Sequence, residues 1–403
     1  MTAVQILPSV HASERPEPAS ALLPVYKRAP VEFVRGAGVE LFDAAGNAYL
    51  DLTSGIAVNA LGYGDAGIAA ALQRAMESGI IHTSNLYHSS PGEQLAQALV
   101  ERSFASSVFF CNSGAEANEG AFKFARRWAR ASGGPAKHEI IALRGGFHGR
   151  LFATLAATDR PHYRAPFRPL AGGVAIAERD LRALDAMLNA ETAAALIVEP
   201  VQGEGGVRVL DAGFLREVRE LTRARRVALI LDEIQCGLGR TGWLFAYERA
   251  GIEPDIVTLA KPLAGGFPMG AVLMSSEIAG AMQPGDHGST FGGGPVVSTV
   301  ALHVLERLAD PALLAQVREN GAWLESALTE MARRTSGIRA VRGMGYMWGV
   351  DVMQAASQVV ARALEAGLLV LSAGEHTVRL LPPLIATRAE LARGLALLED
   401  ALQ

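Results

Sequence analysis

Runs of residues typical of β-strands alternate with runs typical of helices along most of this chain of 403 residues. The expected strands are Ser107–Cys111, Glu139–Ala142, Ala194–Glu199, Val227–Asp232, Ile256–Leu259 and Gly270–Met274. The expected helices between them are Ala115–Ala131, Leu181–Leu188 and Phe214–Arg225. This alternation predicts an α/β fold with a mostly parallel sheet that is covered by helices on both faces. Ligands bind to such sheets at the carboxyl ends of the strands.

The two ends of the chain follow a different pattern. Residues 32–51 read as a short antiparallel meander, and the region after about Pro311 reads as a smaller α+β unit that begins with the helix Leu313–Arg334. A chain of 403 residues also exceeds the size at which one core stops growing. We therefore expect a large domain of residues 51–309 and a C-terminal small domain of residues 310–403, with an N-terminal arm and meander (residues 1–50) packed on the small domain.

The composition excludes several kinds of partner and location. The formal net charge is −4, so neither nucleic acid nor an anionic membrane is an expected partner. No apolar stretch approaches the ~18 residues of a membrane-spanning helix, and the N-terminus lacks the apolar core of a signal peptide. We expect a cytoplasmic protein. His148, His162 and His287 lack the spacing of metal ligands, so no metal site is expected.

Lys261 ends an apolar run that begins at Asp255, and a glycine-rich loop follows it. Desolvation at such a place disfavours the charged amine and makes the lysine nucleophilic enough to form a Schiff base. On its own, a lysine at a strand end is more often a surface residue. Asp232 changes that balance, because it ends another apolar run of the same predicted sheet. Pyridoxal phosphate requires these two groups, a lysine for an imine and a carboxylate for its pyridinium nitrogen.

A candidate phosphate-binding turn follows the strand Ser107–Cys111. The small residues Ser113, Gly114 and Ala115 stand where the strand gives way to a helix. Unpaired N–H groups at a helix N-terminus, together with the positive end of the helix dipole, suit a phosphate. The alternative is an ordinary helix whose N-terminus is capped by a serine.

Other strand ends carry groups that suit a planar ring or a carboxylate. Phe147 stands among glycines after one strand and can stack on a ring, and Arg150 can hold a carboxylate with its two-pronged guanidinium. Glu204 lies in a glycine-rich turn, where it is either solvated or paired with a substrate-binding arginine. Arg379 is the candidate for that arginine, because it interrupts an apolar strand. Ser289 and Thr290 supply hydroxyl groups in a loop that is otherwise a plain glycine-rich turn.

Six segments together resemble the class III, or ω-amino-acid, aminotransferases of fold type I. The likeness rests on Phe110-Cys-Asn-Ser-Gly-Ala-Glu-Ala-Asn-Glu119, Gly146-Phe-His-Gly-Arg150, Leu231-Asp-Glu-Ile-Gln-Cys-Gly-Leu-Gly-Arg-Thr-Gly242, His287-Gly-Ser-Thr-Phe-Gly-Gly293, Lys261 and Arg379-Leu-Leu-Pro-Pro383. Within that family the motifs are most similar to those of acetylornithine aminotransferases. The resemblance implies a pyridoxal-phosphate enzyme that acts as a homodimer with shared active sites.

The resemblance also assigns roles to single residues. Lys261 forms the imine with the cofactor, Asp232 pairs with the ring nitrogen, Phe147 stacks on the ring and Gln235 contacts its phenolic oxygen. The expected cofactor-binding set is Ser113, Gly114, Ala115, Phe147, Asp232, Glu233, Ile234, Gln235, Lys261 and, from the other subunit, Thr290. Arg150 and Ser289 would contact acetylornithine. Arg379 would bind the carboxylate of glutamate or 2-oxoglutarate, with Glu204 as its gate.

The activity implied by the resemblance is ping-pong transfer of an amino group between N2-acetylornithine and 2-oxoglutarate. Alternative substrates within the family are ornithine, succinylornithine, carrier-linked aminoadipate semialdehyde and 4-aminobutyrate, and an isomerase of the glutamate-1-semialdehyde aminomutase type shares the fold. The chain reads Pro262-Leu-Ala-Gly-Gly266 and Gly294 where many relatives have Gly-Leu-Gly-Gly-Gly and Asn. Both differences touch loops near the cofactor, so they leave the substrate preference open.

Overall fold

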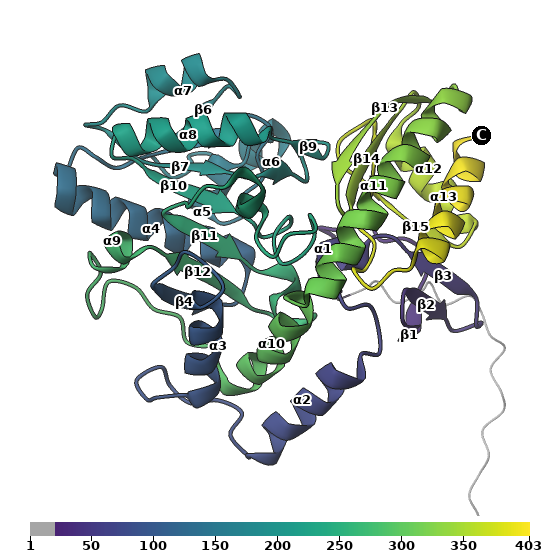
Figure 1. Ribbon diagram of the computed structural model, residues 1–403, viewed down its shortest axis with the longest axis horizontal. Coiled ribbons are helices and arrows are strands. Elements are labelled where there is room, and N and C mark those ends of the chain that lie inside the picture. Colours follow the sequence, from purple (N-terminus) through teal and green to yellow (C-terminus); the bar gives the residue numbers. More distant parts are fainter. Residues whose placement is uncertain (1–20) are drawn as a thin grey trace, which may run out of the picture.

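The computed structural model describes residues 21–403, which form a large sheet with helices on both faces and three smaller sheets (Figure 1). The large sheet has the strand order β4-β12-β11-β10-β7-β5-β6. Its strands are β4 (Ser107–Cys111), β5 (Glu139–Leu143), β6 (Val174–Ala177), β7 (Ala193–Val198), β10 (Ala228–Asp232), β11 (Ile256–Leu259) and β12 (Gly270–Met274). The strands from β11 to β6 run parallel, whereas β12 is antiparallel to both β11 and β4. The prediction of a mostly parallel sheet is confirmed.

Both faces of this sheet are buried, and successive residues of a strand serve opposite faces. In β10, Leu229 packs in an apolar cluster with residues of helix α8 (Ala212–Ala224). The next residue, Ile230, packs in a second cluster with residues of helix α4 (Gly114–Gly133). A strand buried on both faces has to be apolar throughout, which is why the sequence shows continuous apolar runs.

The remaining elements of this part connect and flank the sheet. They are α1 (Ser54–Ala57), α2 (Ala66–Glu77), α3 (Ser90–Val100), α5 (Phe152–Ala157), α6 (Pro161–Arg164), α7 (Leu181–Met187), α9 (Ser276–Ala279), α10 (Pro295–Leu308), and the strand pair β8 (Val201–Gln202) and β9 (Arg208–Val209). Helix α10 was not among the predicted helices, because its first turns contain several β-branched residues, which are weak helix formers. It packs against α2 and α3, and such tertiary contacts stabilise helices more than intrinsic propensity does.

The two ends of the chain meet in one small sheet. The meander consists of β1 (Phe33–Ala37), β2 (Glu40–Asp43) and β3 (Ala48–Asp51), and β15 (Leu368–Leu369) adds to β3 in parallel. A second sheet contains β13 (Ile338–Met344), β14 (Met347–Val352), β16 (Leu371–Ser372) and β17 (Thr377–Leu380), with α11 (Pro311–Arg334), α12 (Ala356–Glu365) and α13 (Arg388–Leu402) beside it. These elements lie to the right of the large sheet in Figure 1. The domain boundaries at residues 50 and 309 stay a prediction.

Among residues 21–403, none of the helices combines the length and the apolar character that crossing a membrane requires. The same residues include no group of three or more His, Cys, Asp or Glu side chains that is arranged to hold a metal ion.

Candidate active site

A cavity of about 420 Å³ lies where several strands of the large sheet end, as expected for this topology. Residues that follow β4, β5, β7, β10 and β11 line it. Most of the predicted site residues are among them: Ser113, Gly114, Ala115, Phe147, Arg150, Glu204, Asp232, Ile234, Gln235 and Lys261. Segments that are far apart in sequence therefore meet in one place.

Lys261 lies two residues beyond the end of β11, at the start of a short 3-10 helix, Lys261–Ala264. Its φ angle is +25°, a backbone conformation that non-glycine residues rarely adopt. Burial lowers the pKa of its amine, and among the nearby charges Arg379 also lowers it while Asp232 opposes the shift. Burial thus favours the neutral form of the amine, which covalent amine chemistry requires.

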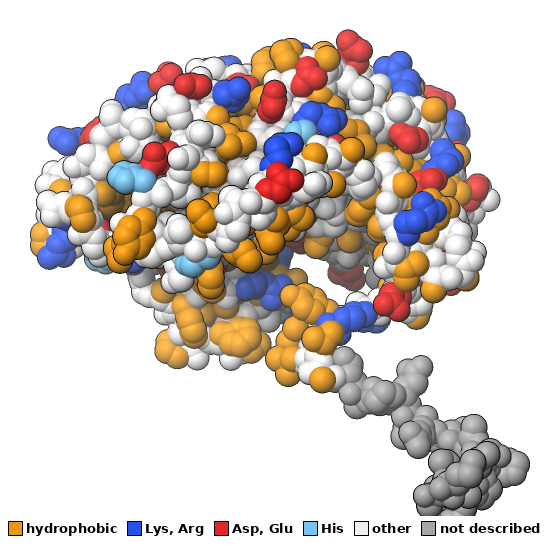
Figure 2. Space-filling view, turned by 90° about the horizontal axis from the view of Figure 1, so that it is seen from below, with side chains coloured by type: hydrophobic (Ala, Val, Ile, Leu, Met, Phe, Trp, Pro, Cys, Tyr) orange, Lys and Arg blue, Asp and Glu red, His pale blue; other side chains and the backbone are white. Residues whose placement is uncertain are grey.

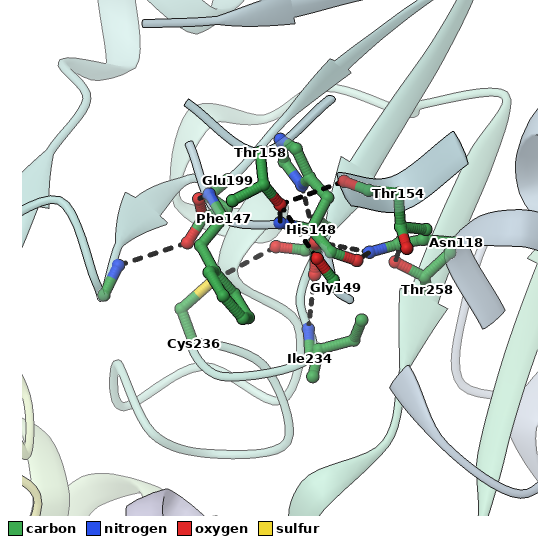
Figure 3. Close-up of polar contacts among 12 residues, drawn as sticks. Asn118, Phe147, His148, Gly149, Thr154, Thr158, Glu199, Ile234, Cys236 and Thr258 are labelled. Carbon is green, nitrogen blue, oxygen red and sulfur yellow. Dashed lines mark hydrogen bonds and ion pairs between the residues drawn. The ribbon is translucent and has the colours of Figure 1, made fainter. Parts of the chain in front are cut away.

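Asp232 is the last residue of β10, and its carboxylate is buried in a network of polar side chains. The Asn118 amide donates to Asp232 Oδ2 at 2.8 Å, and the Nδ1 atom of His148 lies 2.8 Å from the same oxygen (Figure 3). The Thr258 hydroxyl donates to Asn118 Oδ1 at 2.8 Å, which orients the amide so that its NH₂ group faces Asp232. This network holds the carboxylate in one position.

Sequence reasoning did not find the roles of Asn118, His148 and Thr258. Asn118 and His148 belong to motifs that were recognised, but His148 was considered only as a metal ligand. Thr258 stands in an apolar strand next to β10, where its register partner is Asp232. A polar residue inside an otherwise apolar buried strand is the signal that could have found it, because such a group needs a hydrogen-bond partner.

The N-terminus of α4 forms another part of the wall. Ser113 is the N-cap, and its hydroxyl accepts a hydrogen bond from the Glu116 N–H at 3.2 Å. The N–H groups of the first helical residues, Gly114 and Ala115, have no carbonyl partner within the helix. A Cβ atom at Gly114 would lie 2.8 Å from Ile234, so glycine is the residue that lets the helix start close to this side of the cavity.

Arg379 reaches the cavity from β17 through two residues that line it. Its Nη1 atom donates to Glu204 at 2.6 Å and to the side-chain oxygen of Gln235 at 3.1 Å. The Arg379 side chain is 2% exposed, whereas that of Glu204 is 28% exposed. The Nε atom of Arg379 is buried without a hydrogen-bond partner in the described part of the chain. A carboxylate that displaced Glu204 would therefore meet an arginine with an unused donor.

Glu199 is a buried acid that also lines the cavity. Its two oxygens accept hydrogen bonds from the Phe147 N–H at 2.8 Å and the Gly203 N–H at 3.1 Å (Figure 3). Burial raises the pKa of Glu199 to about 7, and the nearby Asp232 carboxylate acts in the same direction. Through its two bonds Glu199 links the loop that carries Phe147 to the loop that carries Glu204.

Besides Arg379, which contacts two lining residues, three predicted residues do not line the cavity of this chain. Glu233 points elsewhere, and its carboxylate accepts hydrogen bonds from the N–H groups of Ala246 and Tyr247. Burial raises the pKa of Glu233 to about 8. Ser289 and Thr290 lie on a separate loop, where the Ser289 hydroxyl accepts a bond from the Asn112 amide at 3.3 Å and Thr290 is exposed.

Arg150 does line the cavity, at its solvent side. Its guanidinium carbon lies 3.5 Å from the centre of the Tyr163 ring and 5.8 Å from that of the Phe147 ring. Contacts of this kind favour a cation over an aromatic face. Tyr163 was not among the predicted residues, and this contact places it next to the predicted substrate arginine.

The residues of the cavity fit pyridoxal phosphate. Lys261 supplies an amine of lowered pKa, Asp232 supplies a fixed buried carboxylate, and the start of α4 supplies backbone donors for a phosphate. Phe147 offers an aromatic face on the same wall. The absence of a side chain at Gly114 lets Ile234 pack against the helix start.

Comparisons with known proteins agree with this geometry. The family model described as Aminotransferase class-III matches residues 24–402. The chain is 45% identical over 386 residues to the acetylornithine aminotransferase of Xanthomonas axonopodis pv. citri, a match that covers 94% of each protein. It is 43% identical over 386 residues to the mitochondrial acetylornithine aminotransferase of Alnus glutinosa, covering 94% of this chain and 85% of that protein.

Solved structures with the same fold include enzymes for two related substrates. The N-acetylornithine aminotransferase of Stenotrophomonas maltophilia is 38% identical with a TM-score of 0.81, covering 93% of this chain and 96% of that one. The ornithine aminotransferase of Toxoplasma gondii, crystallised with partial occupancy of PLP at its active site, is 30% identical with a TM-score of 0.91, covering 95% and 91%. The match over nearly the whole length shows that the chain belongs to the class III aminotransferases, the pyridoxal-phosphate enzymes of fold type I that its motifs resemble.

Proposed function

We propose that this chain is an acetylornithine aminotransferase, which transfers the 5-amino group of N2-acetylornithine to 2-oxoglutarate in arginine biosynthesis. The observation that carries the proposal is the pairing of Arg379 with Glu204 in the cavity that holds Lys261, because it provides a carboxylate-binding cation that is covered until an acceptor arrives. Both sequence relatives described above carry this name.

Different residues of the cavity are proposed to bind different parts of the cofactor. Pyridoxal phosphate, when bound, supplies an aldehyde for the amino group and a ring that withdraws electrons from the substrate carbon. Gly114 and Ala115 would bind its phosphate with their N–H groups, and Asp232 would keep its ring nitrogen protonated. The other residues proposed to contact it are Ser113, Phe147, Ile234, Gln235 and the partner subunit's Thr290. Glu233 instead supports the wall from behind.

Lys261 is proposed to hold the cofactor covalently and then to act as the base. Its Nζ atom would take the proton from the substrate carbon that bears the amino group and later return it. Both roles require a neutral amine, and the lowered pKa of Lys261 increases the neutral fraction near neutral pH. The charge of Asp232 raises that pKa and the charge of Arg379 lowers it, so the two residues together influence the protonation of Lys261.

The Arg379–Glu204 pair is proposed to let one site accept two different substrates. With Glu204 in place, the charge of Arg379 is neutralised, and the amino end of acetylornithine can approach Lys261. When 2-oxoglutarate or glutamate enters, its carboxylate would bind Arg379 and Glu204 would move aside. Glu204 is the more exposed partner and lies in a loop with Gly203, Gly205 and Gly206, so it is the one suited to move.

The carboxylates of the cavity favour an acylated substrate over free ornithine. Glu199 accepts two backbone N–H groups, Glu204 is paired with Arg379, and Asp232 is bound by Asn118. The α-ammonium of ornithine would have to compete for these carboxylates with Arg379, Asn118 and the backbone N–H groups. The acetylated nitrogen is neutral and needs no such partner. Arg150 and Ser289 are proposed to contact this end of the substrate.

Ornithine δ-aminotransferase is the second candidate. It is favoured by the similarity of the fold to the ornithine aminotransferase of Toxoplasma gondii, with a TM-score of 0.91. The isomerase alternative needs no external acceptor, so a strict requirement for 2-oxoglutarate would exclude it.

We also propose that the active enzyme is a homodimer. The loop of Thr290 lies next to the segment 80–87, because the Asn85 amide donates to the carbonyls of Ser289 and Gly292. Large apolar side chains are exposed along this region, among them Ile81 at 65% and Leu86 at 88%. Figure 2, which views the molecule from below Figure 1, shows hydrophobic side chains spread over that face. Exposed apolar surface of this kind marks a protein contact.

The test is a comparison of the first half-reaction for several donors with the holoenzyme. The absorbance of the bound cofactor is followed after mixing with acetylornithine, ornithine, 4-aminobutyrate or glutamate. The proposal expects acetylornithine to have the highest kcat/KM among the ω-amines. An equal or higher value for ornithine or 4-aminobutyrate would assign the enzyme to that substrate instead. The cytoplasmic location stays a prediction, since the Alnus glutinosa relative is named as mitochondrial.

A further inference from the structure

A second cavity, of about 500 Å³, lies beside the active site and is rich in arginine. It is lined by residues of the large-sheet loops on one side and of the β13–β17 region on the other. Six arginines and four carboxylates line it, and no lysine is among the lining residues. One of the arginines, Arg144, is paired with Glu178 at 2.6 Å, and the other five are Arg160, Arg179, Arg208, Arg339 and Arg342.

Most of these arginines form no direct ion pair, although four carboxylates also line the cavity. Arg342 is paired with Asp351 at 2.5 Å. In contrast, the hydrogen bonds of Arg160, Arg208 and Arg339 go to a backbone carbonyl or a methionine, and Arg179 reaches only the side-chain oxygen of a glutamine. Four guanidinium groups therefore face one cavity without an ion-pair partner among the described residues.

Two of these guanidinium groups repel each other. Burial lowers the pKa of Arg179, and the positive charge of Arg208 lowers it further. A bound anion would relieve this repulsion between the two guanidinium groups. Guanidinium groups also present several N–H donors in a plane, which suits phosphate and carboxylate oxygens.

We propose that this cavity binds a small oxyanion with two or more negative charges. The cavity is open to solvent but limited in volume, which favours a small molecule over an extended polyanion, and the arrangement of donors suits a phosphate or a polycarboxylate. The cavity is distinct from the cofactor site, because Lys261, Asp232 and the start of α4 do not line it.

The site is coupled to the active site through one loop. Glu204 lines both cavities. Arg208 donates to the carbonyl of Gly205 at 3.1 Å, and Arg342 donates to that of Gly206 at 2.6 Å. A bound anion would therefore contact the arginines that hold the two residues after Glu204.

The test measures anion binding directly on the holoenzyme, so that its result does not depend on the proposed substrate. Isothermal calorimetry with inorganic pyrophosphate, and separately with citrate, is carried out at constant ionic strength because salt screens exposed charges. The double variant Arg179→Gln/Arg208→Gln should weaken binding by about tenfold or more. Both side chains are exposed, and cofactor content and melting temperature verify that the variant is folded.

The matched control is Arg130→Gln/Arg333→Gln, which removes the same charge from two exposed positions outside the cavity. It should bind the anions as the unmodified enzyme does. The proposal is overturned if neither anion binds to the unmodified enzyme, or if the two double variants lose affinity equally. Binding of one anion but not the other identifies the cavity as a phosphate site or a polycarboxylate site.

Discussion

Replacing Glu204 with glutamine should shift the enzyme towards substrates that bring their own carboxylate to Arg379. The substitution keeps the size of the side chain and removes its charge, so that Arg379 is left with neutral partners. Arg379 is 2% exposed and its bond to Glu204 is 2.6 Å long, so the pair is well shielded from solvent on the arginine side. The glutamate carboxylate no longer has to displace a charged partner when it binds.

The size of the shift follows from the hydrogen bond that is removed. Hydrogen bonds to charged groups contribute about 1.5–3 kcal/mol, and Coulomb attraction between unit charges near a protein surface, about 4 kcal/mol at 4 Å, sets an upper limit. A change of this size corresponds to about a ten- to hundredfold rise in the ratio of kcat/KM for glutamate to kcat/KM for acetylornithine. Single-turnover half-reactions with each donor measure the ratio without interference from the second substrate.

The matched control for this experiment is Glu399→Gln. Glu399 also forms a 2.6 Å pair with an arginine, Arg334, but that arginine is 56% exposed and far from the cavity. This control should leave the ratio unchanged. If Glu204→Gln changes the ratio by less than about twofold, or in favour of acetylornithine, then Glu204 does not cover Arg379 and the gating argument is wrong.

Three further predictions test other parts of the site. Lys261→Ala should abolish turnover and covalent attachment of the cofactor, as seen by absorbance and by mass spectrometry after borohydride reduction; retained turnover would refute its role. Thr258→Val should lower kcat by about tenfold, because the Asn118 amide loses the hydrogen bond that orients it. Thr258→Ser keeps the hydroxyl and should retain most of the activity. A fully active valine variant would contradict the role of Thr258. Glu199 has its pKa raised from 4.5 to about 7 on folding, so the folded state binds the proton more tightly and stability falls as the pH rises from about 4.5 to 7. Melting temperatures of Glu199→Gln should lose this part of the pH dependence, which amounts to at most about 3 kcal/mol, and an unchanged pH profile would show that Glu199 is already ionised.

The positions of Lys261 and Asp232 could be predicted because each ends an apolar run. The run identifies a buried strand, and the topology brings the ends of parallel strands to the same edge. The contacts of Asn118 and His148 could not be predicted in this way. They depend on how closely α4 and the loop after β5 approach Asp232, and this distance is set by packing rather than by local sequence.

The prediction for Glu233 shows a different limit. It was assigned to the cofactor because it belongs to the motif Asp232–Gln235. Neighbouring residues of an extended chain point in opposite directions, so Asp232 faces the cavity while Glu233 faces the N–H groups of Ala246 and Tyr247. The motif is therefore partly structural. Strand β6 was missed for a simpler reason, since four small or apolar residues at the edge of a sheet give little sequence signal.

The small sheet that joins the two chain ends has a consequence for biosynthesis. Strand β3 receives its neighbour β15 only when Leu50 pairs with Leu368, and the Ser54 hydroxyl bonds to the carbonyl of Leu381, 327 residues later. The ribosome synthesises the meander first, and the edge of β3 that pairs with β15 stays unpaired until almost the whole chain has been made. Unpaired edges invite wrong contacts during that interval. The small sheet can therefore be completed only when the C-terminal segment returns to strands that were synthesised at the start.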